Sequence, residues 1–201
     1  MAPQALVLVV TDPPDPLADV VRMLGHGRVL STGTYLDGLR FRFHLARRLG
    51  VSPACVDAQI VGEHGTTEVF LWSSARIAGK PVLELLERTA GQNREVLRQQ
   101  IERQVRYANI AIIEGIGANQ HGIGMAGARI AEILSRNEPA VIPIASYNAE
   151  YDVTLSLPSV LGRSGVSRIL EPPMSDEERK ALRRSADTLK SALARMHFSP
   201  S

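Results

Sequence analysis

An apolar run followed at once by three prolines constrains the fold of this chain more than any other feature. Ala5–Val10 is apolar throughout, which is typical of a strand buried on both faces of a parallel sheet. The next segment, Thr11-Asp-Pro-Pro-Asp-Pro16, ends that strand, and Asp15 with Pro16 predicts the cap and first turn of a helix. Because Arg28–Ser31 predicts a second short strand, we expect a βαβ unit of an α/β fold here.

Hydrophobic periodicity predicts the remaining elements. The predicted helices cover residues 15–24, 36–49, 83–113 with a division at Gly91, 125–134, and a last one that begins with a capping box at Ser175 and Glu178. The predicted strands cover residues 5–10, 28–31, 56–60, 69–72, 140–146, 153–157 and a segment ending at Leu170, with turns at 77–81 and 162–165. Two helices have a predicted apolar face: Leu36, Leu39, Phe43 and Ala46 in the second, and Leu97, Ile101, Val105, Ala108 and Ile112 in the third.

Composition excludes several functional classes. The chain has 201 residues, with 23 Lys and Arg against 21 Asp and Glu, and its arginines are scattered, so we expect no nucleic-acid partner. Its single cysteine, Cys55, cannot form an internal disulfide, which fits a reducing compartment. No apolar run approaches the roughly 18 residues of a membrane span, and the start lacks the charged segment of a signal peptide. We therefore expect a cytoplasmic protein without a membrane partner.

The segment Gly122–Gly127 matches the dinucleotide-binding pattern G-x-G-x-x-G letter by letter. That pattern binds a phosphate where a strand ends directly before the first glycine. Here the preceding apolar residues continue the helical period that begins at Leu97, and Glu114–His121 intervenes. Of the two alternatives, a phosphate cradle and a helix-to-helix corner with close packing at its glycines, we favour the corner.

Three segments contain candidate catalytic groups. Asp37 and Arg40 are three residues apart at the start of a helix, which places a carboxylate and a guanidinium on one face. His64 lies between glycines at the end of a predicted strand, and Asp12 and Asp15 follow the first strand, where open α/β sheets bind ligands. A histidine oriented by a carboxylate is a general acid–base unit, and a nearby arginine can clamp a carboxylate. Each segment also has a structural interpretation, as a packed or exposed histidine or as a solvated ion pair, so spacing alone leaves the function open.

Together these motifs resemble the lactate/malate dehydrogenase family, and within it the L-lactate dehydrogenases. Residues 33–42, Gly-Thr-Tyr-Leu-Asp-Gly-Leu-Arg-Phe-Arg, are similar to the family's helix motif. Residues 60–68, Ile-Val-Gly-Glu-His-Gly-Thr-Thr-Glu, are similar to its catalytic-histidine motif, and Glu63 and residues 69–74 resemble the lactate branch more than the malate branch. Residues 122–126, residues 159–165 and the capped last helix also fit, so the resemblance runs along nearly the whole chain.

The resemblance implies a fold, a cofactor and residue roles. The fold is the family's α+β C-terminal catalytic domain over residues 34–201, preceded by a remnant of the NAD-binding Rossmann domain over residues 1–33. His64 is implied to exchange the proton of the substrate hydroxyl or carbonyl group, Asp37 to hold its imidazole, and Arg40 to grip the substrate carboxylate. A hydride would pass between the substrate and NAD, which Thr32 is implied to contact. No metal ligand is assigned.

Four departures from the family pattern lead to further expectations. Most of the Rossmann half, with its glycine fingerprint and specificity loop, has no counterpart in this sequence. Asp12 stands where the family has an Asn that contacts substrate and nicotinamide, and Asn119 stands where it has a Thr near the substrate methyl group, so both remain candidate binding residues. Asp57 replaces a histidine that, with the arginine matching Arg42, binds fructose 1,6-bisphosphate in allosteric bacterial members, so we expect no such regulation.

The sequence therefore predicts an L-lactate dehydrogenase-like oxidoreductase that interconverts pyruvate and L-lactate, or a related L-2-hydroxy acid, with very low activity for this chain alone. One alternative is an inactive remnant that forms a dimer or tetramer or pairs with a full-length paralogue, because the family's interfaces use the helices matching residues 39–49 and the long helix after Leu83. A second alternative is a fragment of a longer gene.

Overall fold

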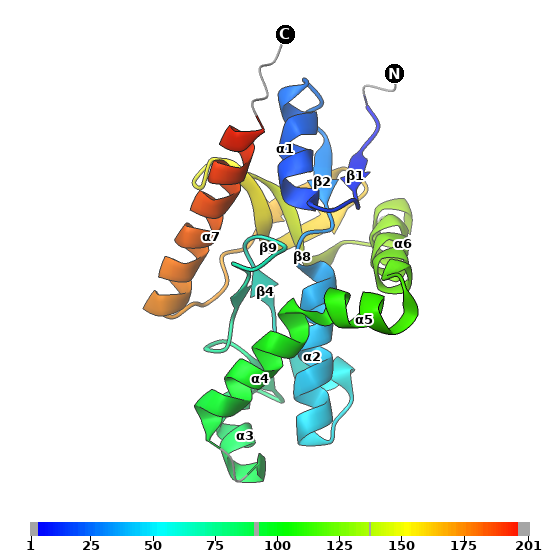
Figure 1. Ribbon diagram of the computed structural model, residues 1–201. Coiled ribbons are helices and arrows are strands. Elements are labelled where there is room, and N and C mark those ends of the chain that lie inside the picture. The colour runs from blue at the N-terminus through cyan, green and yellow to red at the C-terminus, as the bar shows by residue number, and fades with distance from the viewer. Residues whose placement is uncertain (1–3, 91–92, 137, 197–201) are drawn as a thin grey trace.

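A five-stranded mixed sheet organises the fold (Figure 1). The structure, a computed structural model, describes residues 4–90, 93–136 and 138–196. In spatial order the strands are β1 (Val7–Val9), β2 (Val29–Ser31), β8 (Ala140–Asn148), β9 (Val153–Gly162) and β10 (Gly165–Ile169). β1 and β2 are parallel, whereas β2 pairs antiparallel with β8 through Ser31 and Ala145. The predicted βαβ unit is therefore present, and it continues into the antiparallel strands as one sheet.

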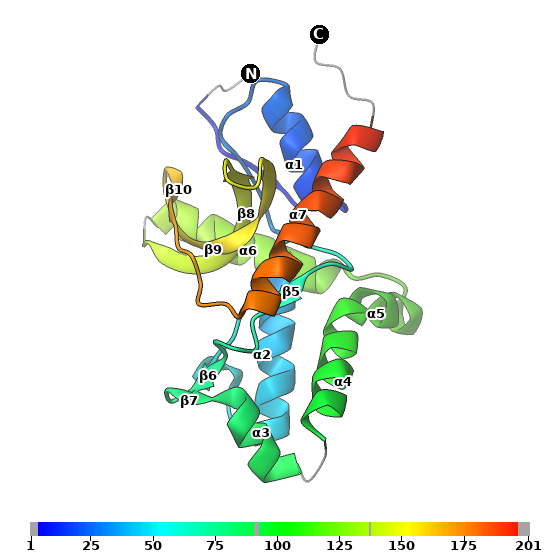
Figure 2. The ribbon, with the colours of Figure 1, turned by 90° about the vertical axis from the view of Figure 1, so that its left-hand side faces the viewer.

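Helices cover both faces of this sheet (Figures 1 and 2). α1 (Pro14–Met23) and α7 (Asp176–Arg195) lie on one face, and α6 (Gln120–Arg136) lies on the other. Apolar side chains of β9 pack with α7 in one buried cluster, and those of β8 pack with α6 in another. α7 begins at the predicted capping box: Ser175 N–H donates to Glu178 Oε2 at 2.8 Å, and Glu178 N–H donates to Ser175 Oγ at 3.2 Å.

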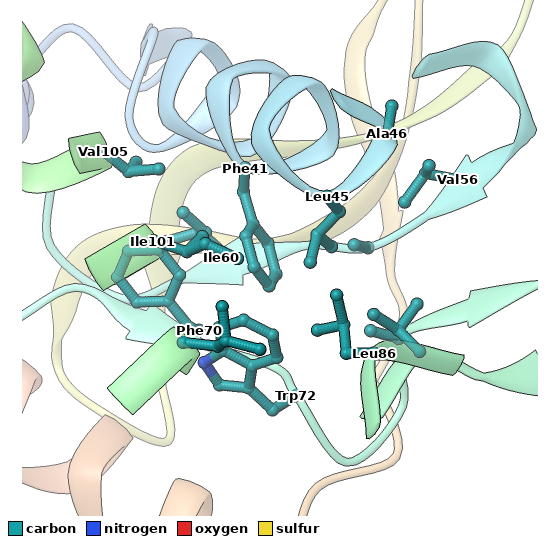
Figure 3. Close-up of a cluster of buried hydrophobic side chains, with 14 residues drawn as sticks. Phe41, Leu45, Ala46, Val56, Ile60, Phe70, Trp72, Leu86, Ile101 and Val105 are labelled. Atoms are coloured by element: carbon teal, nitrogen blue, oxygen red, sulfur yellow. The ribbon is translucent and has the colours of Figure 1, made fainter. Parts of the chain in front are cut away.

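A second core lies between α2 (Tyr35–Leu49), α3 (Val82–Ala90) and α4 (Arg94–Arg106). Figure 3 shows Phe41 of α2 pointing at two aromatic rings, Phe70 and Trp72, whose centroids lie 5.1 and 4.8 Å from its own. The predicted apolar face of α2 is therefore wrong in part: Phe43 is 50% exposed, while Phe41 is fully buried. The aromatic partners, which come from a distant part of the chain, decide which face turns inward.

Short strands connect these two cores. They are β3 (Val56–Asp57), β4 (Ile60–Val61), β5 (Val69–Phe70), β6 (Arg76–Ile77) and β7 (Lys80–Pro81), and a short 3-10 helix, Pro53–Cys55, precedes them. The single strand predicted over residues 56–60 is wrong, because β3 pairs with β6 and β4 pairs with β5 in separate sheets. The predicted pairing with residues 69–72 is confirmed for β4 and β5, and the turn predicted at residues 77–81 connects the β6–β7 hairpin.

Three other predictions are wrong. β1 lies at the sheet edge and is only half-buried, so it is not covered on both faces. Asp15 does not cap α1; the cap position is Pro13, which makes no side-chain hydrogen bond. The long helix after residue 83 is divided again at Tyr107, so Ala108 and Ile112 belong to α5 (Ala108–Ile116).

The predicted division at Gly91 lies outside the described residues. None of the described helices is long and apolar enough to cross a membrane.

The glycine motif lies inside a helix. α6 begins at Gln120, not near Met125 as predicted, so Gly122, Gly124 and Gly127 occupy its first turns. The corner between α5 and α6 comes earlier, at Gly117, whose φ of 82° is left-handed. Close packing is present at Gly122, where an added Cβ would lie 3.3 Å from Leu36, and absent at Gly124, where it would meet nothing within 4 Å. No strand precedes these glycines directly, which removes the basis for a phosphate cradle.

Candidate active site

His64, Asp37 and Arg40 are in direct contact. His64 lies in the loop between β4 and β5, and its Nδ1 is 2.6 Å from Asp37 Oδ2. Arg40, one helical turn after Asp37 in α2, donates from a terminal guanidinium nitrogen to Asp37 Oδ1 at 3.0 Å. The Asp37 residue is only 3% exposed, so one buried carboxylate accepts from an imidazole and a guanidinium at once.

The main chain of His64 is held by a second buried carboxyl group. The N–H of His64 donates to Asp15 Oδ2 at 2.9 Å, and the hydroxyl of Ser31 donates to the other oxygen of Asp15. Asp15 is 1% exposed. Burial raises the pKa of Asp15 to about 6, against the opposing effect of the Ser31 hydrogen bond. Asp15, in the first turn of α1, thus fixes the loop that carries the histidine.

Two further contacts fix this loop against the core. Gly62 has a left-handed φ of 89°, and a Cβ there would lie 2.6 Å from Ser185 Oγ in α7. The next residue, Glu63, donates its N–H to the same hydroxyl at 2.9 Å. The close approach of α7 therefore requires a glycine at position 62, within the histidine motif.

The environment of His64 favours its charged form. Burial lowers the pKa of His64, but the hydrogen bond and the charge of Asp37 raise it more, and the result is a pKa of about 9. At neutral pH the imidazole is therefore protonated and donates its Nδ1–H to Asp37. In this charged form the other ring nitrogen, Nε2, also carries a proton.

A cavity of about 340 Å³ lies beside the imidazole. Five of the six predicted site residues line its wall: Asp12, Thr32, Arg40, His64 and Asn119. The sixth, Asp37, lies behind His64 on a smaller space of about 80 Å³, which shares Asp12, Arg40 and His64 with the larger cavity. The six residues are thus close in space, although their roles stay a prediction.

Four further residues at this site were not among the six predicted site residues. Asp15 was expected as a helix cap and as one of two carboxylates at the ligand-binding end of the first strand, and its carboxyl group accepts a hydrogen bond from the main chain of His64. Asn109 lines both cavities, and Glu68 and Arg106 line the smaller one. Glu68 had one signal in the sequence, its position four residues after His64. Asn109 on α5 and Arg106 on α4 had no such signal, because helix packing brings them to the site.

Comparison with known proteins gives the chain a family. A family profile for the lactate/malate dehydrogenase alpha/beta C-terminal domain matches residues 34–198. The L-lactate dehydrogenase of Chloroherpeton thalassium is 40% identical over 193 residues, which is 94% of this chain and 63% of that protein. The L-lactate dehydrogenase of Deinococcus radiodurans is 40% identical over 190 residues, which is 94% of this chain and 62% of that protein.

Solved structures agree with this match. A lactate dehydrogenase enzyme from a Medee basin deep-sea metagenome library, MGS-M5, superposes with a TM-score of 0.89 at 32% identity, over 96% of this chain and 64% of that one. A minor L-lactate dehydrogenase from Enterococcus mundtii superposes with a TM-score of 0.88 at 31% identity, over 97% of this chain and 64% of that one. The chain thus spans less than two thirds of the length of these relatives. It belongs to the lactate/malate dehydrogenase family and contains that family's α/β C-terminal domain, joined to a parallel β1-α1-β2 unit.

Proposed function

We propose that the chain carries the acid–base and substrate-binding groups of an NAD-dependent oxidoreductase that interconverts L-lactate, or a related L-2-hydroxy acid, with its 2-oxo acid. One observation supports this more than any other. A buried carboxylate, Asp37, holds an imidazole at 2.6 Å and a guanidinium at 3.0 Å beside a cavity that both cationic side chains line. This arrangement supports the proposal, because a 2-oxo acid needs both a proton donor and a group that binds its carboxylate.

Each of the three residues has a distinct task in the proposed reaction. Arg40 binds the substrate carboxylate through the guanidinium donors that it does not use on Asp37. His64 delivers its proton to the oxygen on the second carbon during reduction and takes it back during oxidation. Asp37 orients the imidazole and stabilises its charged form, so that the ring nitrogen facing the cavity carries the proton. The high pKa of His64 suits the reductive direction at neutral pH.

The described residues fit one end of the cofactor. Thr11, Thr32 and apolar side chains such as Val10 and Ile123 line the larger cavity, and such a wall suits a nicotinamide ring. The described part of the chain has no G-x-G-x-x-G segment directly after a strand, because Gly122–Gly127 lies inside α6. When bound, NAD supplies or accepts the hydride, and these residues orient the substrate toward its ring.

The test uses the chain with pyruvate and NADH. We expect very low turnover, measured as loss of NADH absorbance, and we expect it to disappear in His64→Asn. Binding is measured separately, from the NMR shifts of the His64 imidazole during a titration with pyruvate. We expect saturable shifts that vanish in Arg40→Gln. A His64 signal that does not respond to pyruvate at any concentration would contradict the proposed function.

A second candidate function is assembly, which exposed apolar side chains favour. Ile116 at the end of α5 is 67% exposed, and Met125 in α6 is 73% exposed. Exposed side chains of this kind mark contact surfaces in many proteins. We propose that this surface pairs with a second copy, as a dimer or tetramer, or with a full-length paralogue. Light scattering of the purified chain tests pairing with a second copy. A monomer at all concentrations would exclude self-association and leave pairing with a full-length paralogue as the remaining case.

The compartment follows from the cysteine. Cys55 is a free and exposed thiol, which suits a reducing compartment, and we propose the cytoplasm.

A further inference from the structure

Behind the His64–Asp37 pair lies a carboxyl group that the proposed reaction does not use. Glu68 is the residue before β5, and its side chain is 2% exposed. It lines the space of about 80 Å³ that Asp37 and His64 also line. Three carboxyl groups, those of Asp12, Asp37 and Glu68, therefore line one small space beside the same imidazole.

The partners of Glu68 do not satisfy a charged carboxylate. Its Oε1 is buried and has no hydrogen-bond partner among the described residues. Its ion-pair partner is Arg106, whose Nε lies 3.9 Å from Oε1, too far for a hydrogen bond. This Nε is itself buried and has no hydrogen-bond partner in the described part of the chain. A buried carboxylate without hydrogen bonds is strongly disfavoured, whereas the neutral acid costs much less to bury.

Arg106 is committed elsewhere. One terminal nitrogen donates to Glu102 at 3.1 Å, and the other donates to the backbone carbonyl oxygen of Glu68 at 3.1 Å. Its guanidinium carbon also lies 4.9 Å from the ring centre of Phe70. The charge of Arg106 is therefore already shared with one carboxylate, so it compensates a second one poorly.

The charged groups that surround Glu68 and His64 come from five parts of the fold. Asp37 and Arg40 face them from α2, Arg106 from α4, Asp15 from α1, and Asp12 from the loop after β1, while Glu63 lies in the histidine loop itself. Acidic groups outnumber basic ones here. A further negative charge on Glu68 would face Asp37 directly across the small cavity.

We propose that Glu68 is a positioning residue that stays protonated as long as His64 and Asp37 form an ion pair, and that it ionises only in the pH range where His64 also titrates. Burial and the negative charge of Asp37 both raise the pKa of Glu68 well above its usual range, in agreement with this geometry.

The neutral state matters for the proposed reaction, on which this role rests. A charged Glu68 would add a second anion to the environment of the imidazolium and would hold its proton more tightly. A neutral Glu68 leaves Asp37 as the one anion in contact with the ring in this small space, so the proton of His64 is easier to transfer to a substrate oxygen. Glu68 would thus limit the basicity of His64 without touching the substrate.

The experiment is an NMR titration of the His64 imidazole in the parent chain and in Glu68→Gln, which is neutral and nearly isosteric. Because the two groups are coupled, we expect the parent signal to titrate in a broad curve with two steps. In Glu68→Gln we expect one single-proton step, with loss of the upper one. A His64 titration curve of the same shape in both proteins would overturn the proposal. A single-proton curve in the parent chain, shifted along the pH axis but unchanged in shape in the variant, would also overturn it.

Glu102→Gln is the matched control, because it removes the other carboxylate of Arg106 outside the small cavity. Glu102→Gln should keep the two-step titration curve of His64. A single-step curve in this control would overturn the proposal, because the second step would then depend on Arg106. The ¹³Cδ chemical shift of Glu68 in the parent chain reports its protonation state without any variant. A chemical shift typical of an ionised carboxylate at pH 7 would also overturn the proposal. None of these readings needs substrate, so a failed pyruvate titration would remove the proposed function and leave this result intact.

Discussion

The backbone N–H of His64 donates to the side chain of Asp15 at 2.9 Å, although 49 residues separate the two in sequence. This bond connects the first turn of α1 to the loop that carries the imidazole. The Asp15 carboxyl group also accepts a hydrogen bond from Ser31 in β2. The β1-α1-β2 unit therefore fixes the position of His64, which lies within the C-terminal domain matched at residues 34–198.

The first prediction concerns the pH dependence that Asp15 gives to stability. Its pKa of about 6 in the folded chain lies above the ordinary 3.8. Between pH 4 and 6 the folded state keeps a proton that the unfolded state has lost, so stability falls as pH rises, by about 3 kcal/mol for this shift. Asp15→Asn cannot titrate and should lose that part of the slope in urea unfolding. Asp57→Asn, an exposed site on β3, should keep it; equal slopes in the parent chain and Asp15→Asn would contradict the assignment.

The second prediction concerns the alkaline side. The folded pKa of His64, about 9, is raised from 6.5. Its stabilising contribution is complete below pH 6.5 and is lost as pH rises to 9, and the shift corresponds to at most about 3 kcal/mol. His64→Asn should therefore flatten the free energy of unfolding across this range. The exposed His121 is the matched control, and His121→Asn should follow the parent curve. If the free energy of unfolding of His64→Asn fell between pH 6.5 and 9 by as much as that of the parent chain, the prediction would be refuted.

Asp37, Arg40 and His64 could be singled out from the sequence because their signals are local. Asp37 and Arg40 are one helical turn apart, and His64 follows a short strand between glycines, so each motif could be read from a few neighbouring residues. The βαβ unit was predictable for the same reason: an apolar run and a proline cluster signal a strand and its end wherever they occur. Asp12, Thr32 and Asn119, whose selection depended on the family resemblance, line one cavity with Arg40 and His64.

What could not be predicted depends on contacts distant in sequence. The inward face of α2 is set by Phe70 and Trp72, which meet Phe41 and leave Phe43 exposed. Glu68 and Arg106 approach each other across 38 residues, and no spacing rule connects a loop residue to a helix residue at that separation. The local sequence predicted Asp15 as a helix cap, but its side chain accepts a tertiary hydrogen bond from His64 instead.

The third prediction concerns Asp12, whose carboxylate lines the cavity with Arg40 and His64. Two unit negative charges about 4 Å apart repel by roughly 1 kcal/mol in water and roughly 4 kcal/mol near a protein surface. Asp12→Asn should therefore bind pyruvate at least about fivefold more tightly at pH 7, as measured by the His64 shifts. Asp57→Asn makes the same charge change away from the cavity and should leave the affinity unchanged. Weaker binding in Asp12→Asn would mean that Asp12 donates a proton to the substrate instead.

The fourth prediction separates a packed helix from a phosphate cradle at the glycine motif. An alanine Cβ at position 124 would meet nothing within 4 Å, so Gly124→Ala should raise the free energy of unfolding by roughly 0.5–1 kcal/mol, because alanine is the better helix former. At position 122 the added Cβ would lie 3.3 Å from Leu36 in α2, so Gly122→Ala should gain less or lose stability. Neither glycine follows a strand, and the NADH affinity of Gly124→Ala, followed by nicotinamide fluorescence, should equal that of the parent chain. A variant that folds normally but loses NADH would restore the cradle that the sequence pattern suggests.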